Sequence, residues 1–185
     1  RFTGTGAAGV RYVFNGRLRN VASLEQSGLD VTADYRFYVG QHRFNAGVNV
    51  TFIDHIDVAI ADGAAIVDNV DTFGNPVSKR YRVDLGWGRG GLQSNVAVNH
   101  VGSYTDTLST TRAPIDAWTT VDLSLRYAPS VGGWLKGSTF SVVATNVLDE
   151  LPPPAVGTDL LTYGYDAANA DPLGRFVAVE FRKEW

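Results

Sequence analysis

The sequence predicts an all-β chain, an antiparallel up-and-down transmembrane β-barrel, of which it supplies about seven to eight strands of a larger, about 22-stranded wall. Three observations predict this fold. Apolar and polar residues alternate along several segments, many of these segments have the ~9–11 residues that a tilted strand needs to cross a bilayer, and long connections alternate with short ones. The composition agrees, since 20 Gly and 11% aromatic residues are typical of a chain of turns and strands.

The alternation is clearest in residues 29–37. Its apolar positions are Leu29, Val31, Ala33, Tyr35 and Phe37, and polar residues lie between them. Successive residues of a strand face opposite sides, so this segment has one apolar face and one charged face. Residues 44–52 repeat the pattern from Phe44 to Phe52. Because Gly40 and Gln41 lie between the two segments, we expect a tight hairpin there.

Further segments along the chain show the same alternation. They are residues 80–87, 92–104, 117–127, 137–147 and 177–185, with a partial strand near residues 10–14. In the last segment Lys183 interrupts the apolar face, close to the end of the sequence. Each of these segments predicts a strand with one face in contact with lipid.

The connections alternate strictly in length. The short ones lie near residues 40–41, 89–91 and 129–136, and the long ones at residues 55–78, 105–115 and 149–173. Outer-membrane barrels of Gram-negative bacteria have short periplasmic turns and long extracellular loops. The last strand follows a long loop, so this topology predicts a periplasmic C-terminus.

Aromatic residues lie at both ends of the apolar faces. The group at the predicted periplasmic ends is Phe37, Phe44, Trp87, Tyr127 and Trp185. The group at the opposite ends is Phe52 and Tyr81, together with Tyr104. Two aromatic girdles are expected at the membrane interfaces, because rings with a polar tip suit the headgroup level. The apolar faces are therefore predicted to have outer-membrane lipid as their partner.

Charge and cysteine content exclude other classes of protein. The formal net charge is -3 and no basic run is present, which argues against a nucleic-acid partner. The absence of Cys excludes disulfides, thiolate metal sites and a cysteine nucleophile. No apolar run approaches the roughly 20 residues of a membrane-spanning helix. The sequence begins at Arg1 without Met, and we expect it to come from the interior of a longer gene product.

Two other folds share part of this pattern. A soluble β-sandwich that acts as a binding module also alternates apolar and polar residues, although it explains the long strands and unequal loops less well. A small, self-closed barrel would have to pair its charged residues in a narrow interior. These are Asp30, Asp34, Arg36, Arg43, Arg80, Arg82, Asp84, Arg126, Glu180 and Arg182. A wide, wet lumen accommodates them more easily, which favours the larger barrel.

Little in the sequence points to chemistry. His42, His55 and His100 lie in different segments without ligand spacing, so neither catalysis nor a cofactor is predicted. Carboxylates at Asp54, Asp57 and Asp62 in an acidic loop are candidate Ca²⁺ ligands, beside the alternative of a solvated extracellular loop. Tyr163 and Tyr165 are candidates for stacking on a small-molecule ligand such as a sugar or an aromatic compound, beside the equal alternative that they pack the last long loop against the rim. The glycines of residues 86–91 end a strand and open no helix, which indicates a turn.

The C-terminal third resembles a known family. Residues Thr145–Asp149, which read TNVLD, and Pro152–Pro154 resemble a late segment of TonB-dependent receptors. Tyr165-Asp166, residues 172–177, and Gly28–Asp30 after Asn15–Arg17 are similar to that family too. The resemblance implies that residues 1–185 are the C-terminal portion of the receptor barrel. It also implies import of a scarce nutrient such as a ferric siderophore, vitamin B12 or a carbohydrate, with a plug and a TonB-contacting segment N-terminal to this chain.

The end of the sequence is similar to the outer-membrane assembly signal. Gly174, Val177, Val179 and Trp185 match its glycine, alternating apolar residues and terminal aromatic residue, while Pro172 departs from its usual polar position. A strand edge with an apolar face can pair with another strand by β-augmentation. The resemblance therefore implies the barrel-assembly machinery as a further partner.

Overall fold

The computed structural model describes residues 23–61, 63–130, 132–155 and 164–184. They form an antiparallel sheet of eight strands and a separate two-stranded sheet, β6-β7. The strands are β1 (Ser23–Val39), β2 (His42–Ala59), β3 (Val67–Asp68), β4 (Lys79–Arg89), β5 (Leu92–Val101), β6 (Tyr104–Thr105), β7 (Pro114–Ile115), β8 (Trp118–Tyr127), β9 (Ser138–Thr145) and β10 (Phe176–Lys183). One short 3-10 helix, η2 (Gly133–Leu135), lies between β8 and β9. No helix among the described residues is long and apolar enough to cross a membrane.

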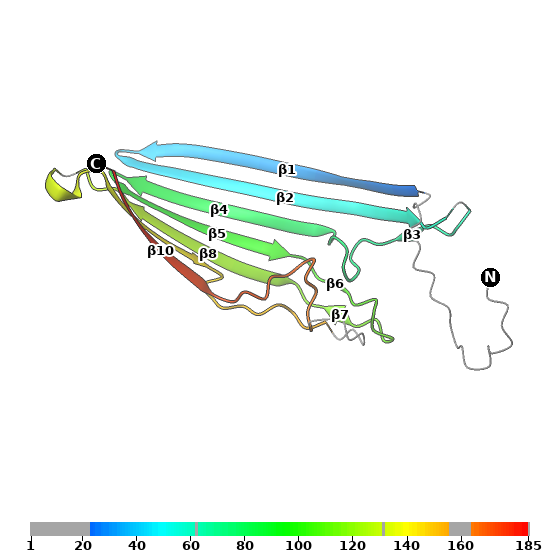
Figure 1. The fold of residues 1–185 in the computed structure, drawn as a ribbon. Helices are drawn as coiled ribbons and strands as arrows, with labels where there is room; N and C mark the ends of the chain where they lie inside the picture. Colours follow the sequence, from blue (N-terminus) through cyan, green and yellow to red (C-terminus); the bar gives the residue numbers. More distant parts are fainter. Residues whose placement is uncertain (1–22, 62, 131, 156–163, 185) are drawn as a thin grey trace.

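The long strands lie side by side in one curved layer in the order β1-β2-β4-β5-β8-β9-β10 (Figure 1). The short connections gather at one end of this layer, which we call the turn end, and the long ones at the opposite end, the loop end. The all-β, antiparallel, up-and-down prediction is thereby confirmed. β1 and β10 form the two open edges, so the described residues make neither a two-sheet sandwich nor a self-closed barrel.

The pairing register of the strands explains why the two faces of the sheet differ in polarity. Phe37 pairs with Phe44, Phe44 with Trp87, and each later strand continues the row without a shift. One face, the apolar face, therefore carries alternate residues of 29–39, 42–52, 79–89, 92–100, 119–127, 138–144 and 177–183. None of these residues is Asp or Glu. The opposite, polar face carries the charged residues that the sequence pattern assigned to the lumen.

The β1–β2 hairpin is longer than the alternation predicted. β2 continues to Ala59, so the prediction that residues 55–59 belong to a loop is wrong. A β-bulge between Ser27 and Gly28 breaks the strict period, which is why the pattern could not be followed beyond it. A Cβ on Gly28 would lie 2.4 Å from the carbonyl oxygen of Phe52, so only glycine fits. The short strand β3 pairs with the extended part of β2.

Other differences are small. β5 ends at Val101 rather than at residue 104, because Tyr104 and Thr105 leave the sheet and pair with Ile115 and Pro114 as β6 and β7. The predicted partial strand at residues 10–14 lies outside the described residues. At the β1–β2 turn, Gly40 has φ +59, a left-handed conformation suited to the tight hairpin that the sequence predicted.

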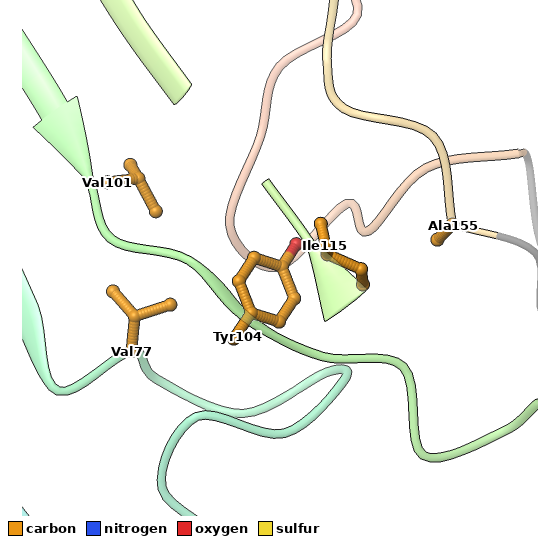
Figure 2. Packing of buried hydrophobic residues seen from close by; sticks show 5 residues of the cluster. All are labelled: Val77, Val101, Tyr104, Ile115 and Ala155. Carbon is orange, nitrogen blue, oxygen red and sulfur yellow. The ribbon is translucent and has the colours of Figure 1, made fainter. Parts of the chain in front are cut away.

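The only cluster of buried apolar side chains among the described residues lies at the loop end. Figure 2 shows its members, which come from three connections and from the end of β5: Val77, Val101, Tyr104, Ile115 and Ala155. Ile115 is 1% exposed and Tyr104 6% exposed. Along the sheet itself, large apolar residues are exposed on the apolar face, for example Leu85 and Val179. That face therefore needs an apolar environment, whereas the loops hold their own small core.

Candidate functional site

A connected set of polar side chains covers the middle of the polar face. The Arg82 guanidinium donates two hydrogen bonds to Asp84, each 3.0 Å long, and another of 2.6 Å to the Asn99 side chain. Asn99 in turn donates to Asp122 over 2.9 Å. Because these groups satisfy one another across β4, β5 and β8, this stretch of the face is a preorganised polar wall.

Arg80 lies on the same face, nearer the loop end. Its Nη2 donates to Oδ1 of Asn169 over 3.2 Å, and no ion pair with a carboxylate is found for it among the described residues. Asn169 also donates to the carbonyl of Asn75 (2.8 Å) and to Asp166 (2.9 Å). Residues 166–169 of the last long loop are thereby held over the polar face at the loop end of the sheet.

Two pockets lie on either side of this contact. The larger has a volume of about 520 Å³ and is lined by Arg80, Asn99 and Trp118 of the sheet and by residues 167–171 of the loop. The smaller, of about 380 Å³, lies between Arg80, Asn169 and the connection around Pro76. A guanidinium, an indole and amide groups face the larger pocket, which suits a ligand that has both a polar or anionic group and a flat surface.

The loops carry two buried carboxylates beside Tyr104. Asp166 is 2% exposed and accepts hydrogen bonds from the N–H groups of Gly74 and Ala168, each 3.0 Å long. Asp106 is fully buried and accepts from the N–H groups of Leu108 and Ser109. Burial, followed by the negative charge of Asp166, raises the pKa of the Tyr104 hydroxyl above its usual range. The hydroxyl therefore stays protonated and bonds to Asp166.

We expect Tyr104→Phe to loosen the loop cluster and to remove a pH-dependent step. A pKa that is higher in the folded protein stabilises it below the ordinary value of about 10, and this stabilisation is lost as pH rises through the folded value. The wild-type loops should therefore become more sensitive to protease above about pH 10, while the variant should be more sensitive at neutral pH and lack this step. Tyr38→Phe, at an exposed ring, is the control. Identical pH profiles for wild type and Tyr104→Phe would contradict the assignment.

The TNVLD segment forms the joint between β8, β9 and the start of β10. Asn146 is 5% exposed and has φ 48, and its side-chain amide exchanges two hydrogen bonds with the backbone of Glu150, of 2.9 and 3.0 Å. Its own N–H donates to Asp122 over 3.0 Å. Asp149 accepts from the Arg175 N–H over 2.7 Å, and a Cβ on Gly174 would lie 2.6 Å from the same carboxylate. The segment thus has a structural role that the sequence alone did not assign.

The predicted ligand and metal residues are only partly described. Tyr163 and Asp62 lie outside the described residues, and Tyr165 is half-buried but does not line either pocket. Asp54 lies 3.4 Å from His55, and Asp57 pairs with Asp68. Where the chain is described, no three carboxylate or imidazole groups converge as metal ligands would. Both sites stay predictions.

Asp68 has a different role. Its carboxylate accepts hydrogen bonds from the N–H groups of Ile56 and Val70, each 3.0 Å long. These two hydrogen bonds lower the pKa of Asp68 below its usual value. Asp68 therefore connects β3 to β2 and to the start of the following segment through backbone hydrogen bonds.

The aromatic residues lie largely where the alternation put them. Phe37 and Phe44 stack with ring centroids 5.0 Å apart, and the Trp87 N–H donates to His42 over 3.0 Å, all toward the turn end. Tyr127 pairs with Phe140, which contacts Phe181 at 5.0 Å. Phe52 and Tyr81 lie on the same face toward the loop end, where Tyr81 stacks on His100 at 4.5 Å. Tyr104 is instead buried in the loop cluster, and Trp185 lies outside the described residues.

The predicted assembly-signal residues Val177 and Val179 are exposed on the apolar face of the edge strand β10, by 54% and 76%. Gly174 precedes the strand at the joint with Asp149. An exposed apolar edge strand is compatible with the assembly role, which stays a prediction.

Sequence reasoning missed the residues that build the mouth of the sheet. Arg80 was assigned to the lumen, but its contact with Asn169 was not foreseen, and neither were the roles of Asp166 and Asp106. The signal for them was local, because an Asp side chain often accepts a hydrogen bond from the backbone N–H two residues on, as Asp166 does from Ala168 and Asp106 does from Leu108. Nothing in the spacing showed which strand the turn would contact.

Comparison with known proteins gives one match. A family model described as "TonB dependent receptor-like, beta-barrel" matches residues 2–147, which is most of the chain. No curated protein and no solved structure matches.

Proposed function

Since this chain belongs to the TonB-dependent receptor β-barrel family, we propose that it helps to import a scarce nutrient, such as a ferric siderophore, vitamin B12 or a carbohydrate. Proteins of this family are outer-membrane receptors and transporters rather than enzymes. The fold supports the proposal, because an apolar face whose described residues include no Asp or Glu suits lipid, and a polar face suits a wet lumen.

In this proposal residues 1–185 are the C-terminal portion of the barrel domain. The open edges of β1 and β10 support it, because unpaired backbone groups cannot face hydrocarbon and need neighbouring strands. The remaining wall, the plug and the segment that contacts TonB would then lie N-terminal to this chain. The turn end would face the periplasm, together with the C-terminus, and the loop end the cell exterior.

Ligand capture is proposed at the larger pocket on the polar face. The observation that carries this step is the position of Arg80, whose guanidinium faces the pocket directly beneath the last loop. Trp118 supplies an aromatic surface in the same pocket. Arg82 and Asn99 line the same pocket, so the Arg82 network continues from it along the polar face.

The test uses the full-length receptor in its own outer membrane. Deleting the gene should abolish uptake of one compound from a panel of ferric siderophores, cobalamin and maltooligosaccharides. That uptake should stop when the proton gradient is collapsed. Because the panel covers all three nutrient classes, unchanged uptake of every compound in the deletion strain would overturn the proposal.

Arg80→Ala should weaken binding of the compound so identified. Loss of a charge-assisted hydrogen bond costs about 1.5–3 kcal/mol, which corresponds to about 10- to 100-fold in Kd. Arg126→Ala, on the same face near the turn end, is the matched control and should bind normally. Binding to intact cells by each variant checks the expectation, and equal losses for both would contradict a pocket centred on Arg80.

A further inference from the structure

Formal positive charges on the apolar face lie only at strand ends. Among the described residues of this face they are Lys79 at the loop end and Arg89 and Lys183 at the turn end. A face that contacts hydrocarbon excludes charge from its middle, but cations near its margins can reach lipid headgroups. Because no Asp or Glu lies among the described residues of this face, these margins suit anionic groups.

A pocket of about 750 Å³ lies at the turn end beside Lys183. It is lined by η2 and the residues that follow it, and by the end of β10: Gly133, Trp134, Lys136, Gly137, Phe181, Lys183 and Glu184. Trp134 is 77% exposed and Phe181 57% exposed. This pocket therefore has an aromatic side and a basic side.

Lys183 holds the backbone of the pocket in place and also gives the pocket a positive charge. Its Nζ donates to the carbonyl oxygens of Trp134 and Lys136, which fixes the turn that carries both side chains. This explains why a lysine interrupts the apolar face. The Lys136 side chain is exposed, and only its backbone carbonyl takes part in this contact.

We propose that this pocket binds the phosphate-bearing headgroup of an anionic phospholipid of the inner leaflet. Charge carries the choice of ligand, because the pocket has two lysines and one glutamate, and Glu184 already lies 3.2 Å from the Arg182 guanidinium. Height along the strand agrees with it. Lys183 lies two residues beyond Phe181, so it is about 7 Å further toward the turn end, at the level where headgroups follow the aromatic girdle. The lipid's acyl chains would lie along Phe181 and Trp134.

The proposal rests on the membrane orientation proposed above, and native mass spectrometry of the full-length receptor in detergent tests it. Phosphatidylglycerol should bind in preference to phosphatidylcholine. Lys136→Gln should reduce phosphatidylglycerol binding about fivefold, as expected for one cation near a lipid surface, and Lys136→Glu should reduce it further. Arg126→Gln removes a charge on the polar face near the same end and should have no effect. Trp134→Ala leaves both lysines in place and should also weaken binding, because it removes the aromatic side of the pocket.

Each possible result either supports or contradicts the proposed lipid site. Equal binding of the two lipids, or equal effects of Lys136→Gln and Arg126→Gln, would overturn the site. Displacement of phosphatidylglycerol by millimolar inorganic phosphate would show a general anion site instead of a lipid site. Heat-dependent migration of each variant on gels verifies folding before lipid is added. A receptor that binds the lipid but imports no nutrient would leave this site standing and defeat the transport proposal, while normal transport with no lipid preference would do the reverse.

Discussion

Leu123→Arg is expected to destabilise the folded barrel by about 2–4 kcal/mol, the cost of an arginine facing lipid near the middle of the membrane. Leu123 lies in the centre of β8, between Val96 and Ala144 on the apolar face, and is 42% exposed. An arginine there has no Asp or Glu partner among the described residues of its own face. Since barrels must fold into the bilayer, most of the variant should fail to reach the folded state.

The neighbouring substitution Ser124→Arg is the matched control. Ser124 pairs with Asn95 and Val143 on the polar face, where a new cation would have water and Asp122 nearby. The same side chain one position along the strand should therefore cost less than about 1 kcal/mol. Urea unfolding of the full-length receptor in lipid vesicles measures both values. A Ser124→Arg protein as unstable as Leu123→Arg would mean that the two faces have been assigned the wrong way round or that neither contacts lipid.

Asn146→Ala should be the other strongly destabilising change, with a loss of about 3 kcal/mol. Two hydrogen bonds to the Glu150 backbone disappear, each contributing about 1 kcal/mol, and the alanine must adopt a left-handed conformation that costs about 1 kcal/mol more. The buried position prevents water from replacing the amide fully. The effect should extend to β10, because the joint also holds Asp149 against Arg175.

Asn146→Gly separates these contributions. Glycine adopts φ 48 without strain but makes no side-chain hydrogen bond, so it should recover about 1 kcal/mol relative to alanine. Thr110→Ala, at an exposed loop position, should remain within about 0.5 kcal/mol of the wild type. Thermal unfolding of the four proteins gives the order. An Asn146→Ala protein as stable as Thr110→Ala would contradict the structural role assigned to the TNVLD segment.

The sheet could be predicted from sequence because its two faces meet different solvents. Apolar and polar residues, such as Val83 and Asp84, alternate strictly along each strand. Because a strand has a period of two, this alternation predicted both where the strands lie and which residues share a face. Prediction failed at Ser27 and Gly28 because the bulge adds one residue to one strand and reverses the phase beyond it. Beyond the bulge Ile56 and Ala59, which lie on opposite sides of the ribbon, are both buried, so the apolar residues there do not follow a single face.

The candidate site was much less predictable for a related reason. Arg80 could be placed on the polar face by its phase, but Asn169, which contacts it, lies in a loop without periodicity. The contact of Tyr104 with Asp166 likewise joins two loops that are remote in sequence. Loop positions are set by individual hydrogen bonds, and a single sequence does not show which donors and acceptors meet. Lys183 is the opposite case. It interrupts the apolar alternation of its strand, and its side chain contacts the backbone carbonyls of Trp134 and Lys136 at that position.

The long β1–β2 hairpin has two parts, and we expect their sequences to change at different rates among related strains. Up to the pairing of Phe52 with Lys79 the hairpin is flanked by β4, but beyond it residues 23–27 and 55–59 continue as a narrow ribbon supported by β3. At about 3.3 Å per residue this ribbon extends roughly 20 Å past the sheet. In the orientation proposed above, this ribbon lies outside the bilayer at the cell surface, so we expect sequence changes there to leave the membrane-spanning wall unchanged. Among related strains, residues 23–27 and 55–59 should therefore diverge faster than residues 29–37 and 44–52 of the same two strands.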